Sequence, residues 1–356
     1  MHILNICETA QGGVGTYQTY LSAMRDRGVI HHHLVPSEHA RHLGEIANLH
    51  VFARPGRGLR AVVNMLREVD RLVPKLRPDI CIFHSTFALA GLAWLRLRRA
   101  RCATIYVPHG WAIAGVAGPG LKFRVIRATE GRLCGLADRV ICVSQAEKAL
   151  ARNFGYRGDM VTIENATPAP SPHARSDLFA SEPDKLHLLF VGRLDHQKGF
   201  DILTEAMQLI KRRDVVVHVL GAPVRGKSLD GPLPESVRLE GWCPHDQVAD
   251  WYASADALIV PSRWEGLPLI IPEALSHGTP VLCSEASGME SLITRGETGE
   301  HFPLDPQNLA GILENLDRTR LRAMRPACRR AYARRFTLER LHDELTCLFN
   351  EISERT

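Results

Sequence analysis

Short apolar runs that are typical of buried strands alternate with longer runs whose apolar residues recur at helical spacing. In the first half this pattern predicts strands at 2–6, 30–35, 79–83, 102–107, 139–143 and 160–163, and helices at 14–27, 59–75, 86–98 and 120–136. Strands that alternate with helices are typical of a parallel sheet with helices on its faces. We therefore expect a doubly wound α/β domain.

The pattern restarts after residues 165–184, a segment rich in proline, serine and alanine that is typical of an interdomain linker. Beyond it we predict strands at 187–192, 215–220, 237–240, 256–260 and 280–283, and helices at 199–212, 245–253, 271–277 and 288–294. This second series predicts a second doubly wound domain.

The end of the chain, from residue 308 onward, is helical in pattern. Its last helix carries one apolar stripe, which consists of Leu338, Leu341, Leu345, Leu348 and Phe349. Such a stripe must be buried against another surface.

The length of 356 residues suits two domains, and 45% hydrophobic and 23% charged residues are typical of a soluble globular protein. The longest apolar run, 87–95, is shorter than the ~18 residues of a membrane span. The amino terminus reads as a strand and not as a secretory signal. Nine dispersed cysteines without a Cys-x-x-Cys pair fit reduced thiols better than disulfides or a zinc site. We expect a cytoplasmic protein without a transmembrane helix.

Charge is distributed unevenly along the chain. Residues 1–170 contain 22 Lys and Arg against 12 Asp and Glu, a net charge of +10, whereas the remainder has 22 against 27, a net charge of −5. Basic residues gather at 96–101 and at Lys122, Arg124, Arg127 and Arg132. The first domain could therefore face an anionic membrane surface or a phosphate-bearing substrate, although for any single cluster we favour a solvated helix face.

Two carboxylates, Glu265 and Glu273, lie eight positions apart across a predicted strand-to-helix junction. Glu265 should lie in the loop at the carboxyl edge of the sheet, where open α/β sheets bind ligands, and Glu273 about one turn into the helix. The two acids could grip two hydroxyl-bearing parts of one polar ligand. Alternatively, Glu273 only complements the helix dipole and Glu265 is a solvated loop residue.

Glycines follow the first strand of each predicted domain. Gly12, Gly13 and Gly15 open the first helix, where backbone N–H groups can approach a ligand closely, but their spacing is not that of the dinucleotide fingerprint. In the second domain, Arg193 and Lys198 lie in the corresponding loop. A guanidinium beside an ammonium suits a diphosphate.

His109 comes just after another first-domain strand and should border the cleft between the domains. It could donate to a sugar hydroxyl or a phosphate, depending on the tautomer that its neighbours impose. The run His31-His32-His33 does not predict a metal site, because consecutive residues of a strand alternate between its faces. Glu130, Ser144, Asn165 and Glu290 are weaker candidates near the same cleft.

Together these elements resemble the retaining nucleotide-sugar glycosyltransferases of family 4, whose architecture of two Rossmann-like domains is called GT-B. The matching elements, in the family's order, are Gly12-Gly13-Val14-Gly15, Pro108-His109-Gly110, Gly192-Arg193-Leu194, Lys198-Gly199, Pro261 to Gly266 and Glu273-Ala274-Leu275. The resemblance implies two doubly wound domains that face a central cleft, with the C-terminal helix crossing back to the first. It assigns 1–170 and 337–356 to an acceptor-binding domain and 171–336 to a nucleotide-sugar-binding domain.

The resemblance also implies roles for single residues. Arg193 and Lys198 would bind the donor diphosphate, Glu273 the ribose hydroxyls and Glu265 the donor sugar. His109 would lie beside the transferred sugar and the acceptor, and Gly12, Gly13 and Gly15 would shape the acceptor side near the phosphates. These implied roles make His109, Glu265, Arg193 and Lys198 the expected catalytic residues.

Two positions depart from the family pattern. Pro268 replaces a glycine that many members carry, and proline has no N–H to offer a phosphate. Any backbone contact there must come from Leu269 or Ile270. Asn165-Ala166 replaces the usual Asn-Gly after the last strand of the first domain.

The resemblance implies transfer of a sugar, with retention of configuration, from a UDP- or GDP-linked donor to a hydroxyl acceptor, without a required metal or other cofactor. We expect a lipid-linked or polysaccharide acceptor in surface glycan biosynthesis, a peripheral place at the inner face of the membrane, and no nucleic-acid partner. A nucleotide-sugar epimerase or hydrolase, a phosphorylase-like enzyme and a non-enzymatic bilobal sugar-binding protein share this architecture and are the alternatives.

Overall fold

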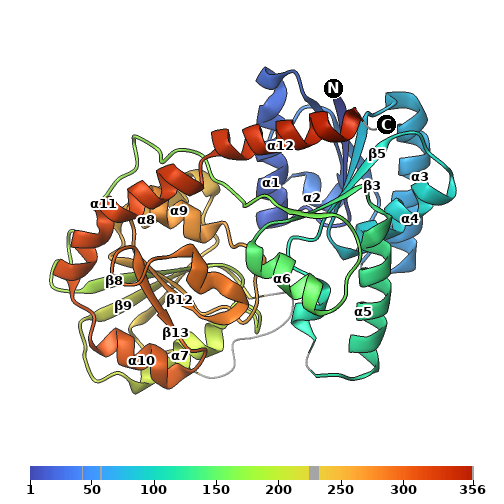
Figure 1. The fold of residues 1–356 in the computed structure, drawn as a ribbon. Coiled ribbons are helices and arrows are strands. Elements are labelled where there is room, and N and C mark those ends of the chain that lie inside the picture. Colours follow the sequence, from blue (N-terminus) through green and yellow to red (C-terminus); the bar gives the residue numbers. More distant parts are fainter. Residues whose placement is uncertain (42, 57, 117, 224–231, 355–356) are drawn as a thin grey trace. The chain divides into compact units, whose positions relative to one another are not determined.

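The computed structural model describes residues 1–41, 43–56, 58–116, 118–223 and 232–354, with only the backbone of residues 245 and 246. The chain forms two compact units, each around one parallel sheet (Figure 1). One unit comprises Met1–Asn165 and the segment that begins at Leu338, and the other comprises Ala166–Thr337. The predicted pair of doubly wound α/β folds is confirmed.

The sheet of the first unit has the strand order β3-β2-β1-β4-β5-β6-β7, and all its neighbouring strands are parallel. The strands are β1 (His2–Cys7), β2 (Ile30–Pro36), β3 (Leu49–Phe52), β4 (Ile80–His84), β5 (Ala103–Val107), β6 (Arg139–Cys142) and β7 (Met160–Thr162). The strand order reverses between β1 and β4, so the loops that follow these two strands diverge at the carboxyl edge.

Helices cover both faces of this sheet (Figure 1). They are α1 (Gly13–Ser22), α2 (Ser37–Ala40), α3 (Leu59–Leu76), α4 (Leu89–Leu97), α5 (Leu121–Leu133), α6 (Gln145–Asn153) and α12 (Leu338–Ser353), with 3₁₀ turns η1 (Ala23–Arg27), η2 (Thr86–Ala88), η3 (Ala112–Gly115) and η4 (Cys134–Leu136). Buried side chains of α3 and α4, such as Met65 and Leu92, pack with Phe83 of β4 on one face. The opposite face is covered by α1 and α12.

The last helix buries its apolar stripe on the first unit, as the resemblance implied. Leu341, Leu345, Leu348 and Phe349 are buried, and the ring of Phe349 lies 6.2 Å from that of His31 on β2. His342 Nε2 donates to the carbonyl oxygen of Tyr20 at the end of α1 (2.9 Å). Apolar burial and this buried hydrogen bond therefore hold α12 beside α1.

The second unit contains a parallel sheet with the order β10-β9-β8-β11-β12-β13. Its strands are β8 (Leu186–Val191), β9 (Val215–Leu220), β10 (Val237–Gly241), β11 (Ala257–Val260), β12 (Val281–Ser284) and β13 (Gly299–Phe302). Its helices are α7 (Phe200–Leu209), α8 (His245–Ser254), α9 (Ile270–Ser276), α10 (Pro306–Glu314) and α11 (Arg318–Arg335), with the 3₁₀ segment η5 (Ala286–Leu292). The strand order reverses between β8 and β11.

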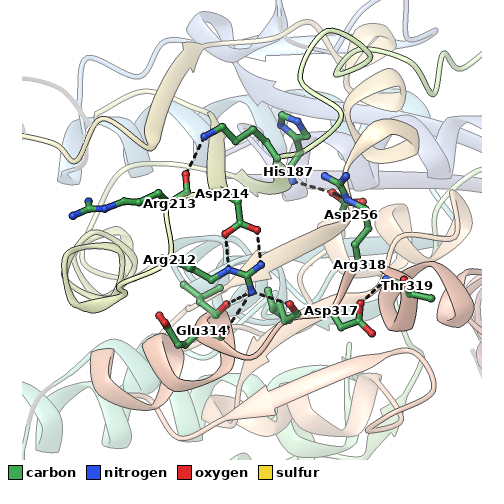
Figure 2. A network of polar contacts seen from close by, with 12 residues as sticks. His187, Arg212, Arg213, Asp214, Asp256, Glu314, Asp317, Arg318 and Thr319 are labelled. Carbon is green, nitrogen blue, oxygen red and sulfur yellow. Dashed lines mark hydrogen bonds and ion pairs between the residues drawn. The ribbon is translucent and has the colours of Figure 1, made fainter.

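Hydrogen bonds tie helix α10, and an ion pair ties helix α11, to the amino ends of these strands (Figure 2). Arg212, just before β9, binds Asp214 through two nitrogens (2.8 and 2.6 Å) and donates to three carbonyl oxygens at the end of α10. Asp256, just before β11, accepts from the backbone N–H of His187 (2.9 Å) and from Arg318 at the start of α11 (3.2 Å). These contacts lie at the amino edge of the sheet, opposite the candidate site.

The sequence pattern misses four elements, which are β3, α2, α6 and β13, and assigns one wrongly. Strands β3 and β13 are four-residue edge strands, and α6 has a largely polar sequence, so none of them carries a strong apolar pattern. The helix expected at 288–294 is wrong: the chain forms 3₁₀ turns there, because Ser287 and Gly288 adopt left-handed backbone conformations (φ 56° and 76°). An α-helix does not accommodate two such residues.

Candidate active site

An ion pair joins the two loops that follow the central strands of the second sheet. Lys198 Nζ, after β8, donates to Glu265 Oε1, after β11, at 2.6 Å. Both side chains are largely shielded, with 18% and 9% of their surfaces exposed. Because β8 and β11 flank the reversal of strand order, the pair lies where open α/β sheets bind ligands.

Arg193 lies in the same loop as Lys198 and is more exposed, at 51% of its side chain. Its Nη2 donates to Gln197 Oε1 at 2.8 Å and lies 3.2 Å from Asp195 Oδ2. Gln197 Nε2 in turn donates to the carbonyl oxygen of Trp264, the residue before Glu265, at 3.1 Å. A guanidinium has five N–H donors, so these contacts leave donors for an anion.

The glycine of the Lys-Gly pair explains how closely the two loops approach. Gly199 has φ +67°, and a Cβ atom there would lie 1.9 Å from the carbonyl oxygen of Pro261. Only glycine fits such a contact in a left-handed conformation. The glycine therefore allows the loop of Lys198 to reach the loop of Glu265.

Glu273 lies in the first turn of α9, as predicted, and its Oε2 accepts from the hydroxyl of Tyr252 on α8 at 2.8 Å. Leu269 is the N-cap residue of this helix and Ile270 its first residue. The first N–H groups of a helix have no acceptor within the helix, so this terminus can face an anion. The roles predicted for Glu273, Leu269 and Ile270 stay predictions.

In the first unit, the glycines after β1 form the tight turn that opens α1. Gly12 has φ +63° and precedes the helix, which begins at Gly13. A Cβ atom at Gly15 would lie 2.6 Å from the carbonyl oxygen of Ala10. Gly15 is thus needed for close packing of helix on loop, whereas the ligand-facing role predicted for Gly12 and Gly13 stays a prediction.

His109 follows β5 in a strained turn and contacts the end of β4. Its φ is +55°, and Gly110 has φ +105°. Its Nε2 lies 2.9 Å from Nδ1 of His84, the last residue of β4. Burial lowers the pKa of His109 to about 3. The imidazole is therefore neutral at physiological pH.

Two buried carboxylates support this turn. Glu147 accepts from the backbone N–H groups of Gly110 and Val143, each at 2.6 Å, and burial raises its pKa to about 7. Glu130 accepts from Thr86, from Tyr156 and from the N–H of Ala112, and burial raises its pKa too. From the sequence, Glu130 is only a weak candidate and Glu147 is missed.

A sequence signal for Glu147 exists in the spacing Ser144-x-x-Glu147, which is that of a capping box. Ser144 is indeed the N-cap of α6, and its Oγ accepts from the N–H of Glu147 at 3.1 Å. The carboxylate, however, reaches the neighbouring loop residues Val143 and Gly110. The motif thus couples the start of α6 to the turn at His109.

Two family models match consecutive parts of the chain. The model described as "Glycosyl transferase 4-like domain" matches residues 12–166, and the one described as "Glycosyl transferases group 1" matches residues 185–318. The chain belongs to the group 1 glycosyltransferases. The predicted family, with its GT-B fold and its retaining, nucleotide-sugar-dependent enzymes, is confirmed. The non-enzymatic alternative is wrong.

One curated relative and two solved structures resemble this glycosyltransferase over different shares of their length. D-inositol 3-phosphate glycosyltransferase of Streptomyces bingchenggensis is 30% identical over 62% of this chain, and the match spans just over half, 55%, of that relative. Sucrose-phosphate synthase from Thermosynechococcus elongatus has the same fold over 100% of both chains, with a TM-score of 0.86 and 18% identity. Anabaena HepE in complex with UDP-glucose matches over 99% of this chain and 100% of its own, with a TM-score of 0.80 and 20% identity.

The structure of this glycosyltransferase brings some predicted site residues together. In the second unit, Lys198 and Glu265 are in contact, and Gln197 links Arg193 to the loop of Glu265. In the first unit, the glycine turn follows β1 and His109 contacts the end of β4, so both lie at the carboxyl edge of the sheet near its reversal. Among the described residues, no cluster of three His, Cys, Asp or Glu side chains is arranged to hold a metal ion.

Proposed function

We propose that this glycosyltransferase moves a sugar from a nucleoside diphosphate donor to the hydroxyl of a glycan or lipid-linked acceptor, with retention of configuration. The observation that carries the proposal is the Lys198–Glu265 pair at the reversal of the second sheet, with Arg193 beside it. It supplies two cations for a diphosphate and a carboxylate for sugar hydroxyls within one pair of loops.

In the proposed reaction, the bond between the anomeric carbon and the diphosphate breaks, and a bond to the acceptor oxygen forms on the same face. The acceptor proton passes to the departing phosphate oxygen, so no separate protein base is needed. Arg193 and Lys198 stabilise the negative charge that develops on the diphosphate, without a required metal. Glu265 holds the donor sugar and Glu273 the ribose hydroxyls.

The donor proposed for the first test is UDP-glucose, because HepE, which shares the fold, was solved in complex with it. A thermal-shift screen should compare UDP, GDP and their sugars, since a bound ligand stabilises the folded state by RT ln(1 + [L]/Kd). We expect the largest shift with a UDP- or GDP-linked hexose. An unchanged melting temperature with every nucleotide sugar would sink the donor assignment.

Arg193→Ala should reduce turnover far more than thermal stability, because the guanidinium is half exposed and its partners lie in its own loop. Lys211→Ala, at an exposed position of the same unit, is the matched control. Turnover in the presence of EDTA should equal that without it. Wild-type turnover of a folded Arg193→Ala variant would remove this residue from the site.

The exposed side chains of helix α5 support a second part of the proposal, namely that the sugar acceptor lies at an anionic membrane surface. Leu121 and Val125 on this helix are 78% and 51% exposed, next to the exposed Lys122 and Arg124. Apolar and basic side chains on one helix suit the interface of an anionic bilayer. No helix among the described residues combines the length and apolarity needed to traverse a bilayer.

Liposome co-sedimentation tests this surface. Binding should be stronger to vesicles with phosphatidylglycerol than to neutral vesicles, and should weaken in a Leu121→Ser, Lys122→Ser double variant. Equal sedimentation with both lipids would exclude the membrane proposal, while leaving the donor site untouched.

Product analysis separates the transferase from the epimerase or hydrolase alternative. A transferase consumes its nucleotide sugar only slowly without an acceptor and forms a glycosylated product with one. Release of a free or epimerised sugar at the full rate without acceptor would favour the alternative.

A further inference from the structure

A row of four polar side chains crosses the face of the first sheet that α1 and α12 cover. Asn5 of β1 lies at its centre, with His31 of β2 on one side and His84 of β4 on the other. Beyond His84 comes His109, the predicted substrate-facing residue. Asn5 and His84 are completely buried. No role has been assigned to Asn5 or His84 so far.

The backbone fixes the orientation of the Asn5 amide. Its Nδ2 lies 3.2 Å from the carbonyl oxygen of His32, which can only accept a hydrogen bond, and 2.9 Å from Nδ1 of His31. The amide oxygen Oδ1 must therefore be the atom that faces His84 Nε2, at 3.2 Å. An amide oxygen accepts only, so His84 Nε2 carries a proton.

The protonation of His84 determines which ring nitrogen of His109 carries a proton. Burial lowers the pKa of His84 well below its ordinary value, so this ring is neutral and its Nδ1 has a lone pair. The contact of 2.9 Å between this Nδ1 and His109 Nε2 then requires the proton to belong to His109 Nε2. His109, also neutral, is left with a lone pair on Nδ1, and this atom has no hydrogen-bond partner among the described residues.

We propose that Asn5 and His84 are positioning residues that hold His109 in the Nε2–H tautomer, so that its Nδ1 accepts a hydrogen bond from a substrate hydroxyl group. The inference rests on the proposed function and narrows the choice of group that His109 contacts. The lone pair on His109 Nδ1 can accept from a hydroxyl, but it cannot bind a phosphate oxygen, which is itself an acceptor. Tyr17 of α1 packs edge-on against the His109 ring, with centroids 4.9 Å apart, and restricts its rotation.

The ring nitrogens of His109 report the tautomer directly. In ¹⁵N-labelled protein at neutral pH, His109→Gln identifies the His109 signals by their loss, and we expect a protonated Nε2 and an unprotonated Nδ1. His84→Phe should mix the two tautomers and lower kcat about tenfold, the loss of one hydrogen bond (~1.4 kcal/mol). A protonated Nδ1 in the wild type would overturn the proposal.

A second variant of His84 that restores the lost hydrogen bond distinguishes a positioning role from a purely structural one. The amide oxygen of His84→Asn can stand near the place of Nδ1 and accept from His109, so this variant should recover the tautomer and most of the turnover that His84→Phe loses. His2→Gln, at an exposed residue of the same sheet, is the control with unchanged signals. If both His84 variants lose turnover equally with a wild-type His109 tautomer, the role of His84 is structural.

The spectra need no substrate, so they also distinguish this inference from the proposed function. A correct tautomer without transferase activity would refute the function and keep the positioning. Transferase activity with a wild-type tautomer in His84→Phe would refute the positioning and keep the function.

Discussion

The carboxyl edges of the two sheets place different polar groups at their candidate site residues. In the second unit, the loops after β8 and β11 present charged side chains: Arg193 is half exposed, and Lys198 and Glu265 form a largely shielded pair. In the first unit, the corresponding edge holds neutral rings and buried carboxyls, such as His84, His109 and Glu147. Around His109 the first edge holds neutral rings and carboxyls with raised pKa values, although Glu8 and Arg54 form a buried ion pair elsewhere on the same edge.

This difference matches the chemistry proposed for each edge. A diphosphate carries charge through the whole reaction, so cationic side chains can bind it. A hydroxyl is neutral and requires a directed donor or acceptor, which a buried and fixed ring supplies. Changes to the charged loops of the second unit should therefore act mainly on turnover, whereas changes to the buried groups of the first unit should also alter stability and its pH dependence.

The largest effect is expected at Lys198. Lys198→Ala should lower kcat about 10²–10³-fold, because it removes a preorganised charge from the departing diphosphate. Its melting temperature should fall as well, because the shielded carboxylate of Glu265 loses its partner. A steady-state assay beside thermal unfolding measures both, with Lys211→Ala as control. A loss of stability with retained kcat would reverse the assignment.

Glu147 should give the clearest pH effect in the first unit. Burial raises the pKa of its carboxyl from 4.5 to about 7, so the folded state holds the proton more tightly than the unfolded state. Its contribution to stability is therefore complete below pH 4.5 and is lost as the pH rises to about 7.

The free energy of unfolding of wild type minus that of Glu147→Gln should thus fall by roughly 3 kcal/mol between pH 4.5 and pH 8. Denaturant titrations at several pH values measure it. Glu45→Gln, at an exposed position of the same unit, should show no such trend. A difference that does not vary with pH would contradict the assigned burial.

The buried histidines of the same unit should show the opposite pH dependence to Glu147, so that their contribution to folding stability is lost as the pH falls. Burial is the main cause that lowers the pKa of His31, His33 and His109 to about 3, so these rings resist protonation in the folded state. Their contribution is complete above pH 6.5 and is lost as the pH falls towards 3.

His33→Gln should reduce this acid sensitivity by roughly 2 kcal/mol at pH 5, because one buried ring no longer has to be protonated on unfolding. Melting temperatures between pH 7 and pH 4 measure it. His173→Gln, at an exposed residue of the second unit, should retain the wild-type trend. An unchanged trend in His33→Gln would show that this ring titrates normally.

The smallest effect is expected at Asp195. Its Oδ1 accepts from the backbone N–H of Lys198 at 3.0 Å, and its Oδ2 lies near Arg193. Asp195→Asn keeps one acceptor and should raise the KM for the donor only about threefold to tenfold, the worth of one partly exposed contact. Asp177→Asn, at an exposed ion pair, is the control. A collapse of kcat would instead place Asp195 in the chemistry.

The residues at the carboxyl edge of the second sheet can be predicted from the sequence better than those at the carboxyl edge of the first sheet. Arg193, Lys198 and Glu265 lie in loops that directly follow apolar strands, so strand prediction alone places them at one sheet edge. Glu273 lies in the first turn of the helix that follows the loop of Glu265. Asn5, His84 and Glu147 come from separate elements, and each is a common polar residue in its own stretch. Their meaning depends on pairs up to 79 positions apart, such as Asn5 with His84.

The sequence by itself determined the two α/β folds, the family and the position of the charged loops, because apolar periodicity and glycine spacing are local properties of a chain. The tertiary structure alone decided which buried polar groups face each other. Tautomers and displaced pKa values follow from desolvation and from hydrogen bonds between distant segments, and these exist only after the chain has packed.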